Sequence, residues 1–315
     1  MAVGQIGAAG VGAGQINIVL TSTDAVTWVQ QDVGTGGRLS GVSYGDGQFV
    51  VVSAWGGGIL TSSNGVNWVQ RSGSSPRLNA VTYGKGQFVA VGYADTADTN
   101  NNQISTPIIL ASTDGLTWVQ RESGISAASA GLAGIAYGNG HFVAVGARYF
   151  GSLGGLTGRA IVTSTDGLKW VEQHSGTEPD SLTSVAYGNG QFVAMGDGML
   201  TSTDGVNWVQ RQSGTQAYLL FGVAYGIGHF VAVGAEGAIL QSGSIIALAL
   251  ARKPSTDLLT LSLEGPTGLA YTIQSSSDLV SWRNATNITS AQPINVIFDA
   301  LRPESNRVFY RAYTE

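Results

Sequence analysis

The sequence predicts an all-β fold, a β-propeller of about six four-stranded antiparallel blades, followed by a small β-sandwich-like module. A phrase built around Tyr-Gly-x-Gly-x-Phe returns along the chain, with its tyrosines 38 to 54 residues apart. This spacing is typical of propeller blades. The 46 glycines interrupt every window in which a helical period could develop. Together the repeat and the glycine pattern favour stacked β-sheets.

The sequence of each repeat predicts two successive β-hairpins. In the most compact repeat, residues 182–187 alternate, and Gly188-Asn189-Gly190 predicts a tight turn into a second strand at 191–195. A third strand is expected at 199–202 and a fourth at 206–211. One such sheet could not bury both of its faces, whereas sheets stacked around an axis can.

Six repeats divide the first 250 residues, with five or seven as alternatives. Repeat 1 begins at the position of a second strand, so its opening strand is expected either from C-terminal residues or from upstream. Repeat 6 opens normally, and residues 244–250 are predicted as its last strand. The predicted repeats are 1–38, 39–77, 78–131, 132–181, 182–219 and 220–250, followed by a linker at 251–257 and the module at 258–315.

A second phrase, Ser-x-Asp-x-x-x-Trp, follows the first in repeats 2 to 5, is also present in repeat 1, and is called the box below. Its Ser and Asp side chains can accept backbone N–H groups, and its tryptophan can pack on a neighbouring blade. Repeat 2 has Asn64 in place of the aspartate. We interpret the boxes as structural. Their principal residues are Asp24, Trp28, Trp68, Asp114, Trp118, Asp166, Trp170, Asp204 and Trp208.

The box resembles, one residue shorter, the Ser-x-Asp-x-Gly-x-x-Trp phrase of bacterial Asp-box (BNR-like) repeat propellers. This resemblance covers roughly residues 1–245 and implies the propeller fold. Some proteins of that wider group are sialidases. Such an enzyme needs clustered arginines, whereas Arg71, Arg121 and Arg211 recur periodically after Trp-Val-Gln.

Composition excludes several functions. The net charge is −5 and no Lys/Arg cluster is present, so we expect no nucleic-acid partner. No apolar run approaches the ~18 residues of a membrane span. The chain has no cysteine, which excludes disulfides and thiolate metal sites. The first residues do not resemble a signal peptide.

About five strands are expected after residue 258. The stretch from Tyr271 to Trp282, with Phe309-Tyr310-Arg311-Ala312, resembles small C-terminal β-sandwich modules of exported Verrucomicrobia and Planctomycetes proteins. That resemblance implies an extracellular or cell-surface location.

Repeats 3 and 4 carry insertions at 93–107 and 147–159, between their second and third strands. Both should rise from the face opposite the boxes, and repeat 2 adds Trp55 there. Exposed aromatic rings beside amides and charges suit a sugar or a peptide. The predicted ligand-binding residues are Trp55, Tyr93, Asp95, Asp98, Asn100, Asn102, Arg148, Tyr149, Phe150 and Arg159.

Asp98, Asn100 and Asn102 have the first spacings of a Ca²⁺-binding loop, but the glycine and the final acid are missing. We therefore expect no cofactor, with Ca²⁺ as the alternative. The predicted function is non-catalytic binding or adhesion toward a glycan or protein. The alternatives are a self-associating subunit of a surface layer or filament, and a glycan-active hydrolase or lyase.

Overall fold

The structure is a computed structural model with two compact domains, the propeller domain (Met1–Leu240) and the C-terminal domain (Gln241–Glu315). Among the described residues no helix is long and apolar enough to cross a membrane. The described residues are 1–6, 16–24, 26–31, 33, 37–56, 58–72, 76–97, 101, 103–126, 129–150, 155–173, 180–211, 219–226, 228–242, 247–253, 258–264, 270–278, 280–289, 294–299 and 309–314.

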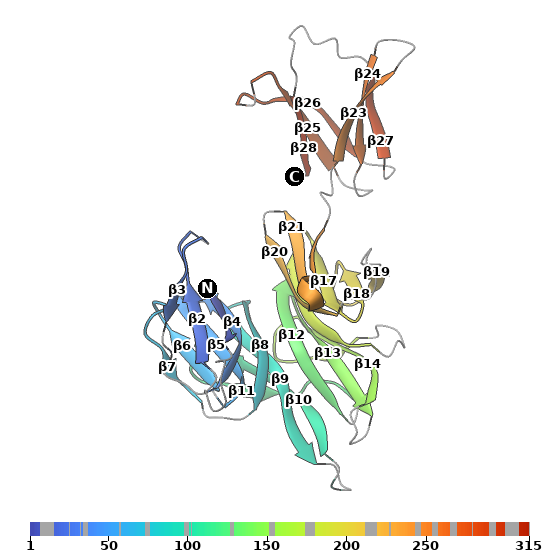
Figure 1. The fold of residues 1–315 in the computed structure, drawn as a ribbon. Helices are drawn as coiled ribbons and strands as arrows, with labels where there is room; N and C mark the ends of the chain where they lie inside the picture. Colours follow the sequence, from blue (N-terminus) through green and yellow to red (C-terminus); the bar gives the residue numbers. More distant parts are fainter. Residues whose placement is uncertain are drawn as a thin grey trace. The chain divides into compact units, whose positions relative to one another are not determined.

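Repeats 2 to 5 each form a four-stranded antiparallel sheet with its strands in chain order (Figure 1). In repeat 5 the predicted turn is present, with positive φ at Asn189 (46°) and Gly190 (75°). The strands are β4 (Arg38–Gly45), β5 (Gln48–Trp55), β6 (Ile59–Ser62) and β7 (Val69–Gln70); β8 (Arg77–Gly84), β9 (Gln87–Ala97), β10 (Gln103–Ser112) and β11 (Val119–Arg121); β12 (Ala130–Gly138), β13 (His141–Phe150), β14 (Gly155–Ser164) and β15 (Val171–Glu172); β16 (Leu182–Gly188), β17 (Gln191–Gly196), β18 (Met199–Ser202) and β19 (Val209–Arg211).

Repeats 1 and 6 form three-stranded sheets. Repeat 1 has β1 (Ala2–Ile6), β2 (Ile16–Thr21) and β3 (Val29–Gln31). Repeat 6 has β20 (Leu220–Gly226), β21 (His229–Gly234) and β22 (Ile239–Gln241), with the short 3₁₀ helix η1 (Ala235–Gly237) before β22.

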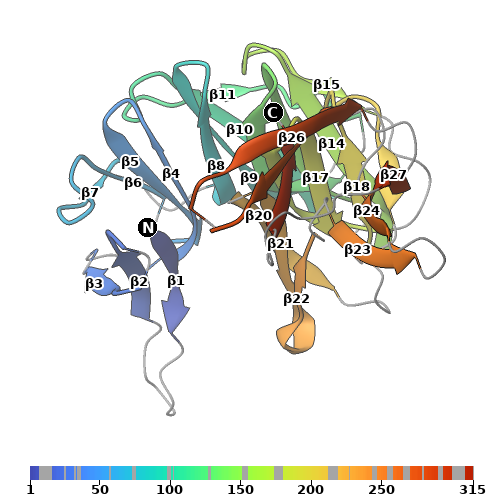
Figure 2. The same ribbon diagram turned by 90° about the horizontal axis from the view of Figure 1, so that it is seen from above.

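The opening strands of successive repeats adjoin one another, so they form the inner part of the propeller (Figure 2). They are β4, β8, β12, β16 and β20. The all-β propeller with four-stranded blades is thereby confirmed. Five blades begin with an opening strand, where the sequence predicted about six, because repeat 1 contributes no such strand to the described residues.

Residues 247–250 do not supply the last strand of repeat 6, which was predicted at 244–250, and residues 244–246 lie outside the described residues. Residues 247–250 belong to β23 (Ala247–Lys253), which pairs along its whole length with β24 (Leu258–Glu264). The alternating Ala-Leu-Ala-Leu pattern fits either partner, and β24 offers a continuous register. The domain boundary therefore falls after Leu240, whereas the sequence analysis placed it after residue 250, and the predicted linker 251–257 overlaps β23.

Consecutive blades are held together by tyrosines packed on glycines. A Cβ at Gly45, Gly84, Gly138 or Gly188 would lie 2.0 to 2.2 Å from the ring Cγ of the next repeat's tyrosine. Only glycine permits this approach. The tyrosines that cover these glycines are, in the same order, Tyr83, Tyr137, Tyr187 and Tyr225.

The box tryptophans pack across the same interfaces. Trp118 of repeat 3 joins a core cluster with Val50 and Val52 of repeat 2, and its Nε1 donates to the Gly115 carbonyl at 3.0 Å. Trp170 is 6% exposed. Trp28, in repeat 1, is 42% exposed because no preceding sheet covers it among the described residues.

Each box is closed by its aspartate or asparagine. In repeat 3, Asp114 Oδ1 accepts the N–H groups of Leu116 and Thr117 at 2.8 Å each, and Ser112 Oγ donates to it at 2.9 Å. These bonds, led by the Thr117 N–H, lower the pKa of Asp114 from 3.8 to about 2. The pKa is lowered in the same way at Asp24, Asp166, Asp204 and Asp278.

The described residues of the C-terminal domain form two three-stranded sheets, ordered β23-β24-β27 and β26-β25-β28. Its connection from Ser276 to Trp282 contains a further box: Asp278 Oδ1 accepts the N–H groups of Val280 at 2.8 Å and Ser281 at 2.7 Å. The remaining strands are β25 (Ala270–Ser276), β26 (Arg283–Thr289), β27 (Ile294–Asp299) and β28 (Phe309–Thr314).

Candidate functional site

The insertions of repeats 3 and 4 are paired hairpin arms. β9 and β10 stay in register from Phe88 opposite Ser112 to Ala97 opposite Gln103. β13 and β14 likewise continue to Phe150 opposite Gly155, with an irregularity after Arg148. Antiparallel pairing gives hydrogen-bond partners to the backbone N–H and C=O groups of both insertions. Both insertions were expected to be loops. Figure 1 shows the arms directed to the same side of the propeller domain.

The two arms are joined by Ser129, which precedes β12. Ser129 is buried, and its Oγ accepts the N–H of Ser105 on β10 at 3.0 Å. Its carbonyl accepts the N–H of Tyr149 on β13, also at 3.0 Å. Burial raises the pKa of the Tyr149 hydroxyl, and the nearby Tyr93 adds to this shift. The arms therefore share one surface.

Three predicted residues meet around an arginine in this surface. The guanidinium of Arg77, the first residue of β8, lies 3.5 Å from the centroid of the Trp55 ring and 5.4 Å from that of Tyr93. Arg77 also forms an ion pair with Asp95 at 2.6 Å and donates to the Tyr93 hydroxyl at 3.1 Å. Trp55, Arg77, Tyr93 and Asp95 are called the Arg77 cluster below.

The contacts within the Arg77 cluster hold the Arg77 guanidinium in one place. Arg77 is held from three sides, and stacking on Trp55 adds a cation–π attraction of about 1 kcal/mol. Trp55 itself remains 54% exposed. The Asp95 carboxylate is also partly exposed. The result is a pre-ordered platform with an aromatic ring, a carboxylate and a phenol available to a ligand.

The two predicted arginines of repeat 4 are engaged elsewhere. Arg148 forms an ion pair with Glu172 at 2.5 Å, and the Ser126 hydroxyl donates to the same carboxylate at 3.1 Å. Arg159 is buried and forms an ion pair with Asp180, which connects repeat 4 to the entry of repeat 5. Both arginines brace the arms and contribute no free cation to the Arg77 cluster.

Asp98, Asn100 and Asn102 lie outside the described residues, as does the side chain of Phe150. Within the described part of the chain, no group of three or more His, Asp and Glu side chains could hold a metal ion.

Sequence reasoning did not identify Arg77 or Ser129. Arg77 and Arg38 occupy the same position, at the first residue of an opening strand, so Arg77 looked like part of the repeat. The available signal was its place next to the insertion: Arg77 stands opposite Tyr93 in the β8–β9 register. Ser129 carries no distinguishing pattern, since its role depends on backbone groups.

No protein-family model matches the sequence, and no match was found among curated proteins. Solved structures of similar fold include YCF48 from Cyanidioschyzon merolae, with 16% identity and a TM-score of 0.45 over 79% of this chain and 87% of that chain. A streptogramin B lyase has 10% identity and a TM-score of 0.46 over 81% and 83%. YjhT has 10% identity and a TM-score of 0.49 over 78% and 88%. These identities are too low to transfer a ligand or an activity.

Proposed function

We propose that the chain is a binding module without catalytic activity that recognises a glycan at the Arg77 cluster. The observation that carries this proposal is an exposed indole held in place by a stacked arginine. A rigid aromatic face matches the apolar face of a sugar ring, and fixed polar groups beside it orient hydroxyls. Asp95 and the Tyr93 hydroxyl are such groups.

The pairing of the carboxylates near this surface weighs against a glycoside hydrolase. Of the carboxylates that flank this surface, Asp95 is paired with Arg77 and Asp180 with Arg159. Glycoside hydrolysis requires two carboxylic groups facing one bond, one of them able to donate a proton. Among the described residues of the arms, no pair of carboxylates is left without an arginine partner.

A glycan array probed with the labelled full chain tests the proposal. We expect hits whose affinity, measured by calorimetry, falls at least about tenfold in Trp55→Ala, since stacking on an exposed aromatic ring carries much of such binding. Trp28→Ala is the matched control, because Trp28 is also a partly exposed tryptophan but lies in a box. No hits, or equal losses in both variants, would contradict the proposal.

An extracellular location belongs to the same proposal, because secreted and surface modules commonly meet glycans. Fractionation of the native organism tests it, with the protein expected in the surface or medium fraction and a purely cytoplasmic protein counting against it.

A further inference from the structure

Repeat 2 departs from the repeats that follow it at one position of its second strand, close to Trp55. In repeats 3 to 6 this position is a glycine that stands opposite a leucine of the opening strand, whereas in repeat 2 it is Ser53, opposite Leu39. A Cβ at Gly92 of repeat 3 would lie 1.9 Å from the Arg77 carbonyl oxygen. The regular backbone therefore cannot carry a side chain here. The glycines are Gly92, Gly146, Gly196 and Gly234.

A β-bulge makes room for Ser53. In repeat 3 the residue directly after the glycine stands opposite the first residue of the opening strand. In repeat 2 the register shifts, so that Arg38, the first residue of β4, stands opposite Trp55 instead of Ala54. Bulges commonly change the direction of a side chain beside a functional site. Here the bulge brings an indole opposite an arginine.

The Ser53 hydroxyl holds the backbone of both residues. Ser53 is 1% exposed, and its Oγ shares one proton between the carbonyl oxygens of Arg38 at 2.9 Å and Trp55 at 2.6 Å. The same oxygen accepts the N–H of Trp55 at 3.3 Å. Buried hydroxyl groups with several partners make the surrounding backbone rigid. Arg38 and Trp55 therefore begin from fixed places, although both side chains are exposed.

Arg38 differs from the other arginines beside this surface because it has no acidic partner. Arg77, Arg148 and Arg159 each form an ion pair, whereas exposed Arg38 forms none with the described residues. Directly opposite residues of an antiparallel pair lie on the same face, with Cβ atoms about 4.5–5.5 Å apart. The Arg38 guanidinium can therefore reach a substituent of a sugar ring that stacks on Trp55.

We infer that the ligand is an anionic glycan and that Arg38 binds its carboxylate or sulfate group, an inference that rests on the proposed function. The sugar ring lies on the indole of Trp55, and the acidic substituent faces Arg38. A guanidinium binds such oxyanions through charge-assisted and often bidentate hydrogen bonds. Asp95 is paired with Arg77 at 2.6 Å, so it leaves no uncompensated negative charge beside the ligand.

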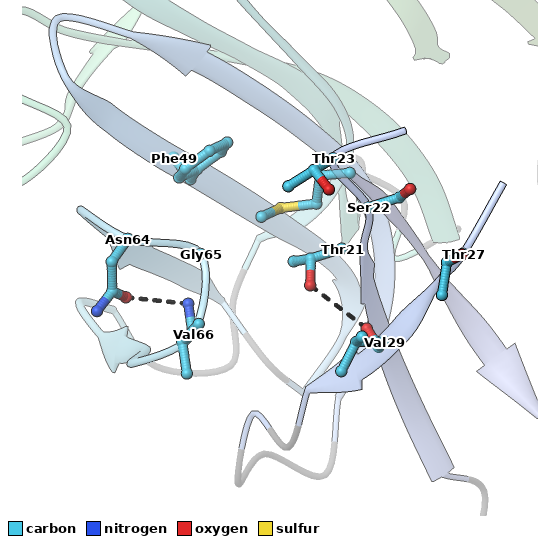
Figure 3. A pocket seen from close by; sticks show the side chains of 10 residues that line it. Thr21, Ser22, Thr23, Thr27, Val29, Phe49, Asn64, Gly65 and Val66 are labelled. Carbon is cyan, nitrogen blue, oxygen red and sulfur yellow. Dashed lines mark hydrogen bonds between the residues drawn. The ribbon is translucent and has the colours of Figure 1, made fainter. Parts of the chain in front are cut away.

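A pocket at the other end of β5 does not offer the same chemistry. It has a volume of about 460 Å³ and lies between the boxes of repeats 1 and 2, where Thr21, Thr27, Phe49 and Gly65 line it (Figure 3). None of the described residues that line it has a charged side chain. An anionic sugar is therefore expected at Trp55 and not in this pocket.

Calorimetry with the full chain tests the charge of the ligand. Oligosaccharides of pectin, alginate and hyaluronan are each compared with their methyl esters, and a carrageenan oligosaccharide with its desulfated form, so that carboxylate and sulfate are separated. Neutral cello-, manno- and galacto-oligosaccharides complete the set. We expect the tightest binder to be acidic and to lose at least about tenfold in affinity when its charge is removed. Its binding should also weaken as salt is raised.

Variants of the protein locate the acidic group. Arg38→Gln should keep the Tm, because Arg38 is exposed, and should lower the affinity for the acidic oligosaccharide at least about tenfold. It should leave the affinity for the uncharged form unchanged, whereas Trp55→Ala should weaken binding of both forms. Arg283→Gln is the matched control, since it removes the same charge at an exposed position of the C-terminal domain.

The possible results separate this inference from the proposed function. Neutral glycans that bind as tightly as acidic ones and depend on Trp55, with no effect of Arg38→Gln, would overturn the inference and leave the proposed function in place. Equal losses in Arg38→Gln and Arg283→Gln would also overturn it, because they would show general attraction of charge. If no glycan binds, acidic or neutral, the proposed function fails and this inference fails with it.

Discussion

Gly188→Ala tests the contact that joins one blade to the next. The added Cβ would lie 2.0, 2.3 and 2.4 Å from three ring carbons of Tyr225, where ordinary contacts begin near 3.4 Å. Tyr225 is also packed on Phe230, with ring centroids 4.8 Å apart, so it cannot turn aside freely. Overpacking of a core commonly costs 1–3 kcal/mol. We expect a loss of about 3 kcal/mol, which lowers the Tm by roughly 6–12 °C in a domain of this size.

Chemical denaturation followed by tryptophan fluorescence measures this loss. Gly226→Ala is the matched control, since it makes the same change at the equivalent position of repeat 6, where nothing lies within 4 Å. Its free energy of unfolding should be unchanged or higher by about 0.4–1 kcal/mol, because alanine restricts the unfolded chain. Equal effects of the two substitutions would refute the packing of tyrosines on glycines.

Further predictions concern the boxes and the arms. Trp170→Ala should lower the free energy of unfolding, measured in urea, by about 3–5 kcal/mol. Trp28→Ala should lower it by less than half of that, because the Trp170 side chain is 6% exposed and the Trp28 side chain 42% exposed. Equal losses in the two variants would contradict the assigned packing. The folded pKa of Asp114 is about 2, below its usual 3.8, so its stabilisation is complete above pH 4 and is lost as the pH falls toward 2. Asp114→Asn should therefore flatten the acid limb of a stability–pH curve, and an unaltered limb would count against the bonds described. Asp180→Ala should lower the free energy of unfolding by about 3 kcal/mol, because it removes the carboxylate partner of buried Arg159. An unchanged Tm in thermal denaturation would show that the ion pair does not stabilise the arm.

Much of the propeller could be predicted because its signals are local. The alternation, the Asn189-Gly190 turn and the box are each contained in a few residues, and each recurs several times. The tyrosine on glycine contact was also present in the sequence, as Tyr-Gly in five repeats. Its meaning was missed because the glycine touches a different repeat, which only the stacked arrangement brings near.

The wrong assignment of residues 247–250 has another cause, which is competition between two equally good strand partners. Residues 247–250 fit a strand of either domain, and the choice depends on β24, which comes later in the chain. The insertions looked like loops because their composition is polar, yet polar residues pair well in an exposed antiparallel arm, as Thr96 and Thr106 do at 2.7 Å. The box of the C-terminal domain was overlooked because it lies outside the repeats.

The candidate site was only partly predictable. Trp55, Tyr93 and Asp95 were found because they interrupt the repeat, and the structure brings them together. Arg77 was missed because it occupies a regular position of the repeat, although it contacts the other three residues of the Arg77 cluster. Long-range pairing, such as that of Arg159 with Asp180, follows from blade packing and has no local signature.

Hydrogen–deuterium exchange across the opening strands tests the arrangement of the repeats most directly. β12 and β16 are packed between two neighbouring sheets, whereas β20 has one such neighbour among the described residues. Exchange should therefore be slowest in β12 and β16 and clearly faster in β20. Protection of β20 equal to that of β12 would contradict the account, because it would mean that a further strand already covers Gly226.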